Sequence, residues 1–393
     1  MTARASTAAS AFRPQPDFLA FAGAAGCSGA GSANDADSAV IKLGTTGPLT
    51  GPAAAYGIAV EAGMKIAVEE INAKGGIQFE FKAEDDEADG EKAVSAYNAL
   101  KDWGMDIFLG SVTSGAAAAS AAEAVNDQIF MLTPSASAVE VAQAGANVFQ
   151  MCFTDPNQGA SAAELMKQQW PDATIGMIYD SSDAYSAGIA AGFLAKAEEL
   201  GLNVAVSDAA FTADTKSDLS TQVTMCKDAG CDLVFLPFYY SEASQVLTYA
   251  NTIGYAPTFF GCDGMDGILT VEGFDAALAE GLVLMTPFDP NATDDATVSF
   301  VTKFKEQNDG LVPNQFAADG YDCVYAVYEA LTAKGLDGSA SASDICAALV
   351  EWFTTNAGFD GLTGKGMTWD AEGMISKAPA AVVITNGIYV PMG

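Results

Sequence analysis

The chain has 393 residues, half of them hydrophobic, and it carries 50 acidic against 17 basic side chains, for a formal net charge of −33. An acid excess of this size argues against nucleic-acid binding, because neutralising phosphates requires a basic footprint. The chain contains no histidine, which excludes Ser-His-Asp and Cys-His catalysis and His-ligated zinc. Its length exceeds what one hydrophobic core usually organises, so two lobes are expected.

Residues 41–77 have the pattern of a buried strand, a Gly/Pro/Thr loop and an amphipathic helix. Val60, Met64, Ala67 and Ile71 recur at helical spacing, which predicts that this face of the helix covers a sheet. The loop would then lie at the carboxyl end of a strand, where open α/β sheets bind their ligands.

The pattern continues as two series in which strands and helices alternate. In the first series we predict strands at 79–86, 107–110 and 129–133 and helices at 91–103 and 116–125. In the second we predict strands at 174–179, 203–206, 232–237 and 258–261 and helices near 185–200, 217–229 and 241–253. Such alternation predicts an α/β protein with two parallel sheets.

Several motifs match one family in order along the chain. The loop at 47–57 fits GxxTGxxAxYG, the helix ends in EINAxGGI at 70–77, and residues 153–159 fit FxDPxQG. A GxTG at 361–364 is followed by DxxG at 370–373. Residues 40–393 therefore resemble the branched-chain amino-acid type of ABC-transporter substrate-binding protein.

That resemblance implies a periplasmic-binding-protein type I fold, in which two Rossmann-like lobes with parallel sheets are joined by a three-segment hinge. It places the N-terminal lobe at 40–155 and 287–362 and the C-terminal lobe at 156–286 and 363–393. The hinge crossings are then expected near Asp155, Pro287 and Thr363.

The amino terminus resembles a bacterial lipoprotein signal. Residues 1–26 carry two arginines and a short apolar run, and they are followed by Cys27 and a Gly/Ser-rich stretch. We predict a signal at 1–26, lipidation of Cys27 and a flexible tether at 27–39. A disordered start or a misassigned initiator is the alternative.

Ligand contacts are expected at strand ends. Ser114 begins a predicted helix, whose free N–H groups and dipole favour an anion, and Ser135 and Ser137 follow the next strand. The resemblance implies that these serines contact a carboxylate, although each taken alone could be a helix cap or a turn former.

The resemblance also implies that Asp263 holds the ligand's ammonium group and that Tyr239 assists it. Asp266 and Tyr240 are the neighbouring alternatives at these two positions. Aromatic side chains are expected to select the ligand's side chain, and the candidates are Tyr56, Tyr185 and Phe316.

The seven cysteines include no CxxC pair that would suggest a metal or redox site. Buried free thiols are expected rather than a disulfide framework. Cys226 and Cys231, which flank a predicted helix end, are the pair of most interest.

The resemblance implies an extracytoplasmic receptor, lipid-anchored to the outer face of the cell membrane or periplasmic. It would capture an amino acid, branched-chain or otherwise neutral, by hinge closure and deliver it to the membrane permease of an ABC importer. The alternatives are a signalling receptor or a receptor for amides, urea or small carboxylates. An enzyme such as a two-carboxylate glycosidase is disfavoured, because the acidic run 84–87 has no sugar-stacking tryptophan nearby. No cofactor or metal is expected.

Overall fold

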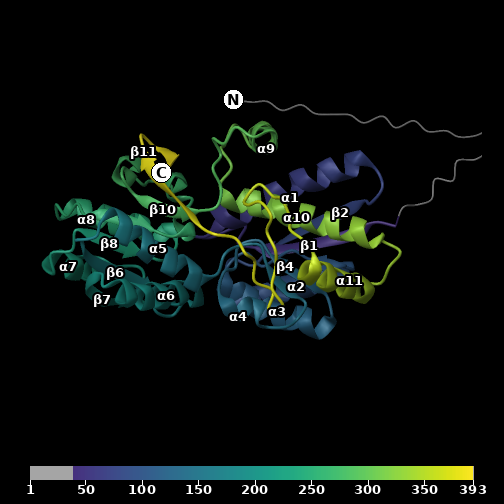
Figure 1. Cartoon of the computed structure of the whole chain (residues 1–393), viewed down its shortest axis with the longest axis horizontal. Helices are drawn as coiled ribbons and strands as arrows, with labels where there is room; N and C mark the ends of the chain where they lie inside the picture. Colours follow the sequence, from purple (N-terminus) through teal and green to yellow (C-terminus); the bar gives the residue numbers. More distant parts are fainter. Residues whose placement is uncertain (1–38, 393) are drawn as a thin grey trace, which may run out of the picture. The chain divides into compact units, whose positions relative to one another are not determined.

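The computed structural model describes residues 39–392 and contains two sheets (Figure 1). The predicted signal at 1–26 and the predicted lipidation site Cys27 lie outside the described residues. The first sheet has the strand order β2-β1-β3-β4-β5, and all of its pairings are parallel. Its strands are β1 (Ile41–Gly47), β2 (Phe79–Asp85), β3 (Ile107–Phe108), β4 (Phe130–Thr133) and β5 (Val148–Gln150).

The second sheet has the order β12-β11-β10-β9-β8-β6-β7. Its strands are β6 (Thr174–Asp180), β7 (Asn203–Phe211), β8 (Leu233–Leu236), β9 (Thr258–Gly261), β10 (Val283–Thr286), β11 (Ala380–Thr385) and β12 (Ile388–Pro391). The pairings are parallel from β7 to β10, whereas β11 is antiparallel to both β10 and β12. The predicted α/β fold with two parallel sheets is confirmed, with this antiparallel edge added.

Helices pack against the sheets, which is why the central strands read as nearly continuous apolar runs. With the first sheet lie α1 (Ala54–Lys74), α2 (Gly90–Trp103), α3 (Ser114–Asp127), α4 (Val139–Ala142), α9 (Asp295–Gln307), α10 (Gln315–Lys334) and α11 (Ala342–Thr355). With the second lie α5 (Asp155–Gln169), α6 (Ala184–Leu200), α7 (Ser220–Asp228) and α8 (Tyr240–Thr252). Short 3-10 turns occupy η1 (Asp263–Met265), η2 (Ile268–Thr270) and η3 (Ala276–Ala279).

Local chemistry explains where the helices that approach the cavity begin. Asn314 caps α10 by accepting the N–H of Ala317 at 3.1 Å, and Asp183 caps α6 by accepting the N–H of Tyr185 at 2.8 Å. Such caps satisfy donors that have no partner inside the helix. Each cap therefore fixes the first turn from which an aromatic side chain projects, Phe316 in α10 and Tyr185 in α6.

The chain passes between the sheets three times. It leaves the first sheet after β5 and enters α5, which packs on α6, and it returns after β10 to α9, which packs on α1. The third passage comes later than the motif at 361–364 suggests. Trp369 Nε1 donates to the carbonyl of Gln150 at 2.7 Å, and the N–H of Gln150 donates to the carbonyl of Gly373 at 2.9 Å.

Lys377 extends this attachment to the first lobe, since its ammonium group donates to Asp319 in α10 at 2.6 Å. The chain then joins the second sheet at Ala380 in β11. These contacts keep the chain on the first lobe as far as Lys377, so they favour a third passage at 378–379 rather than at 363. The motif at 361–364, on which the expected boundary rests, packs inside the first lobe. No helix within 39–392 combines the length and the apolarity that crossing a membrane requires.

Candidate functional site

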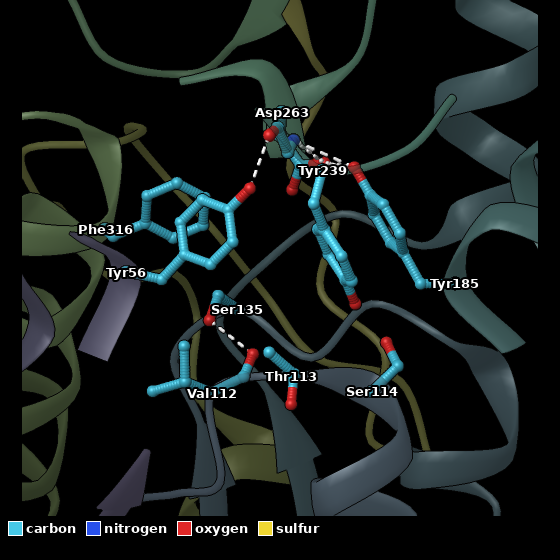
Figure 2. Close-up of a pocket in the computed structure, with 10 residues that line it drawn as sticks. Tyr56, Val112, Thr113, Ser114, Ser135, Tyr185, Tyr239, Asp263 and Phe316 are labelled. Atoms are coloured by element: carbon cyan, nitrogen blue, oxygen red, sulfur yellow. Dashed lines mark hydrogen bonds between the residues drawn. The ribbon is translucent and has the colours of Figure 1, made fainter. Parts of the chain in front are cut away.

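A small cavity lies where the carboxyl ends of strands from both sheets meet (Figure 2). Its volume is about 20 Å³. Seven of the eight predicted ligand-contact residues line it, together with three residues that were not predicted. The lining residues are Tyr56, Val112, Thr113, Ser114, Ser135, Tyr185, Tyr239, Asp263, Gly264 and Phe316.

The first lobe supplies the polar floor of the cavity. Ser114 is the first residue of α3, and its hydroxyl accepts the N–H of Ala138 at 3.2 Å. The hydroxyl of Ser135 donates to the carbonyl of Val112 at 2.7 Å, which ties together the loops after β3 and β4. The first hydrogen bond within α3 is donated by Ala117, so the N–H groups of the preceding turn have no partner inside the helix. This floor suits an anionic group.

Aromatic rings form the sides. Tyr56 lies against Phe316 with ring centroids 4.6 Å apart, and Tyr185 stacks on Tyr239 at 4.9 Å with an interplanar angle of 4°. Figure 2 shows these two pairs on opposite sides of the cavity. The four rings make most of the wall apolar, as expected for a pocket that selects a ligand by its side chain.

Asp263 stands opposite the serine floor, at the end of β9, and is 3% exposed. Its Oδ1 accepts the hydroxyl of Tyr185 at 2.6 Å and the N–H of Gly264 at 2.8 Å. Gln158, in α5, holds the backbone by accepting the N–H of Asp263 at 2.7 Å. Both hydrogen bonds to the carboxylate end on Oδ1, which leaves Oδ2 as the oxygen for a further donor.

Burial raises the pKa of the Asp263 carboxyl, and the hydrogen bond from Tyr185 partly opposes that rise. None of the ten lining residues, all in the described part of the chain, is Lys or Arg. A cation that entered the cavity would therefore be the partner that this carboxylate lacks. The geometry supports binding of a molecule with a cationic end near Asp263 and an anionic end near Ser114.

The eighth predicted residue, Ser137, does not line the cavity. It is 0% exposed, and its carbonyl accepts the N–H of Asp155 at the start of α5. Ser137 therefore lies behind the wall, where it contacts the segment that passes between the lobes.

The two neighbouring alternatives also lie off the wall. Asp266 accepts the N–H of Gln315 at 3.2 Å, and the hydroxyl of Tyr240 accepts the N–H of Ala55 at 3.2 Å. Sequence reasoning missed Val112, Thr113 and Gly264. Each is adjacent to a predicted residue or to another of the three. Their position directly after a strand is the sequence feature that could have identified them.

No cluster of three or more His, Cys, Asp or Glu side chains that could hold a metal ion occurs within residues 39–392. The cavity wall offers hydroxyl groups, aromatic rings and one carboxylate, a mainly apolar lining with a few polar groups that is typical of small-molecule sites.

Comparisons with known proteins agree with this architecture. Residues 40–387 match the family model described as periplasmic binding protein. The chain is 30% identical over 310 residues to the Leu/Ile/Val-binding protein BraC3 of Rhizobium johnstonii, covering 77% of this chain and 81% of that protein. It is 28% identical over 332 residues to the leucine-, isoleucine-, valine-, threonine- and alanine-binding protein of Pseudomonas aeruginosa, covering 81% and 86%.

A solved structure gives the same result. The branched-chain amino acid transporter substrate-binding protein LivJ of Streptococcus pneumoniae, in complex with isoleucine, superposes with a TM-score of 0.79 at 27% identity, covering 89% of this chain and 97% of that one. The resemblance to branched-chain amino-acid substrate-binding proteins is confirmed, and the chain belongs to the periplasmic binding protein family.

Proposed function

We propose that the protein is the extracytoplasmic receptor of an ABC importer and captures a neutral amino acid between its lobes. The observation that carries the proposal is the opposition of Asp263 to the first turn of α3 across one cavity. A zwitterionic amino acid carries a positive charge that suits Asp263 and a negative charge that suits the first turn of α3. Leaving either charge buried without a partner would cost several kcal/mol.

Each part of the ligand has proposed partners. The carboxylate would accept hydrogen bonds from the α3 N-terminus and from the hydroxyls of Ser114 and Ser135. The ammonium would donate to Asp263 beside Tyr239, a charge-assisted contact of about 1.5–3 kcal/mol. Tyr56, Tyr185 and Phe316 would enclose the side chain. Ser137 would reach the ligand only if its loop moved, because other residues cover it.

The size of the cavity bears on how binding occurs. A volume of about 20 Å³ accommodates one or two water molecules, which is less than an amino acid requires. A ligand would therefore enter while the lobes are further apart, and closure would follow around the three passages between the sheets. We keep the two lobes expected from the resemblance and move only their last boundary, from 362/363 to 378–379. The first lobe then comprises 40–155 and 287–378, and the second comprises 156–286 and 379–393.

The names of the relatives support a neutral ligand. One binds leucine, isoleucine, valine, threonine and alanine by its name, and the LivJ structure holds isoleucine. We propose the same class of ligand here, with the permease of the importer as partner. Attachment to the membrane through Cys27 is part of the proposal and rests on the sequence before residue 39.

Calorimetry on the purified chain tests the ligand class. Leucine would be compared with 4-methylpentanoate, which lacks the ammonium group, and with 3-methylbutylamine, which lacks the carboxylate. We expect at least one neutral amino acid to bind, and both analogues to bind at least about tenfold more weakly, which corresponds to about 1.4 kcal/mol.

A wider panel of ligands could contradict the proposed ligand class. Glutamate should bind more weakly than neutral amino acids, because no Lys or Arg on the cavity wall could neutralise a second carboxylate. If glutamate, urea or benzoate bound more tightly than every neutral amino acid, the proposed ligand class would be wrong.

A further inference from the structure

Cys226 lies in the last turn of α7, and Cys231 follows the end of that helix. Helix α7 belongs to the second lobe and packs on β6 and β7 (Figure 1). The N–H of Cys231 donates to the carbonyl of Cys226 at 3.0 Å, and the N–H of Gly230 donates to that of Lys227 at 3.0 Å. Gly230 has a φ of 71°. This pair of bonds around a left-handed glycine is the Schellman ending of a helix, which brings the first and the sixth residue of the motif into side-chain contact.

In this chain both contact positions carry a thiol. The two sulfur atoms approach the same point on β6, because a Cβ added to Gly176 would lie 2.7 Å from Sγ of Cys226 and 3.1 Å from Sγ of Cys231. Both sulfurs belong to free thiols in this structure. The absence of a side chain at position 176 therefore leaves both sulfurs room beneath the helix end.

Other contacts hold the pair in place. The hydroxyl of Tyr255 donates to the carbonyl of Cys231 at 2.8 Å, and both cysteines are buried. A disulfide requires Cα atoms about 4.4–6.8 Å apart and side chains that face each other. The hydrogen bond from Cys231 to the carbonyl of Cys226 keeps the two backbones close, and both sulfurs lie within 3.1 Å of the Cβ position built on Gly176, so the two side chains converge.

We propose that Cys226 and Cys231 form a disulfide bond that closes the carboxyl end of α7. The second reactant is a disulfide-bearing oxidant, and the reaction is thiol–disulfide exchange. The extracytoplasmic location proposed above is a compartment in which such bonds form and persist. The chemistry itself does not depend on that location or on the ligand.

The exchange proceeds in two steps. The thiolate of one cysteine, Cys231, attacks a sulfur of the oxidant, forms a mixed disulfide and releases one thiolate, which takes up the proton that Cys231 has lost. The thiolate of Cys226 then attacks the sulfur of Cys231 and releases the second thiolate, which takes up the second proton. Two protein thiols are oxidised, and the oxidant disulfide is reduced to two thiols.

The order of the steps follows from the environment of the thiols. Burial raises the pKa of the Cys226 thiol to about 12, whereas the neighbouring Cys226 side chain partly opposes the rise that burial causes in the pKa of the Cys231 thiol. Cys231 is thus the more readily ionised of the two. Because the native thiols are covered, the reaction is expected when the helix end opens locally, and this order applies to that case. If the bond forms earlier, during folding, either thiol can attack first.

Tryptic mapping tests the proposal directly, because Lys227 lies between the two cysteines. The full chain would be unfolded and refolded with a mixture of reduced and oxidised glutathione, blocked with N-ethylmaleimide and digested without reductant. We expect peptide 217–227 to be joined to peptide 228–303 in most of the protein, and the two to separate after reduction. Recovery of both peptides mainly as maleimide adducts would overturn the proposal.

Variants identify the partner, since peptide 228–303 also contains Cys262. The linked species should persist in Cys262→Ala and disappear in Cys231→Ala. Reductant should lower the melting temperature of the parent chain and of the matched control Cys346→Ala, but leave that of the Cys226→Ala/Cys231→Ala double variant unchanged. A linkage that survives in Cys231→Ala and is lost in Cys262→Ala would assign the bond to a different pair and contradict the proposal. None of these results depends on whether the protein binds an amino acid.

Discussion

The hydroxyl of Tyr185 donates a 2.6 Å hydrogen bond to Oδ1 of Asp263, and both side chains are buried. The bond comes from the first turn of α6 and holds a carboxylate at the end of β9 in one orientation. The cost of burying this carboxylate is only partly offset by such neutral donors. A cationic partner would therefore stabilise the ionised form of the buried Asp263 side chain.

The first prediction concerns the charge of Asp263. Asp263→Asn keeps the shape of the side chain and removes its negative charge, so the affinity for a neutral amino acid should fall at least about tenfold, or about 1.4 kcal/mol. Calorimetry on the folded variant measures this. Asp266→Asn is the matched control, because Asp266 is also buried but lies off the cavity wall. Equal affinity of Asp263→Asn and the parent chain would remove Asp263 from the site.

The second prediction concerns pH. Burial raises the pKa of Asp263 in the unliganded protein, whereas a bound ammonium group would favour the ionised form and lower it. Ligand binding should then release a proton, and affinity should fall as the pH decreases through the raised pKa, starting above the usual aspartate value of about 3.9.

Calorimetric titrations in buffers with different ionisation enthalpies would measure how many protons are released per ligand bound. The Asp263→Asn variant should show a flatter pH profile than the parent chain. Affinity that rises on acidification, with the protein still folded, would contradict the assignment of the ammonium to Asp263.

The third prediction concerns closure. The hydroxyl of Tyr56, in α1, donates to the carbonyl of Gly264, which follows β9 of the second sheet. Tyr56→Phe removes this contact between the lobes and should destabilise the closed form by about 1 kcal/mol. Small-angle scattering should therefore give a larger radius of gyration for the unliganded variant than for the parent chain.

Saturating ligand should bring the two proteins to the same radius. Tyr255→Phe is the control, because the hydroxyl of Tyr255 bonds to Cys231 within the second lobe. A Tyr56→Phe radius that matches the parent and the control, with and without ligand, would mean that this contact does not hold the lobes together.

The fourth prediction concerns a buried ion pair beside the third passage. Lys377 Nζ donates to Asp319 Oδ1 and to Thr363 Oγ1, each at 2.6 Å, and Thr363 in turn donates to Asp322 at 2.7 Å. Lys377→Met would leave buried carboxylates without their cation, so it should lower the free energy of unfolding by about 3–5 kcal/mol.

Urea denaturation measures the loss. Lys65→Met is the comparison, because Lys65 pairs with Glu61 on the exposed surface of α1, where a pair contributes about 0–1 kcal/mol. Similar losses in the two variants would show that the pair formed by Lys377 stabilises no more than a surface contact.

The sequence by itself determined the features that depend on local chemistry. The repeat of strand, turn and helix follows from side-chain periodicity and from capping residues such as Asp183 and Asn314, which act over a few neighbours. Ser114 could be selected before its surroundings were known because ligand sites of parallel sheets gather at strand ends. Asp263 was selected through the family resemblance, which places an acidic residue on such a loop.

The tertiary structure decided the features that depend on distant contacts. Tyr239 rather than Tyr240 lines the cavity, since the hydroxyl of Tyr240 accepts an N–H from Ala55 in the other lobe. The last passage lies beyond 363 because Trp369 bonds to Gln150, 219 positions earlier in the chain. Neighbouring residues have similar local preferences, so only the packing of segments remote in sequence determines which side chain faces the ligand and where the chain leaves a lobe.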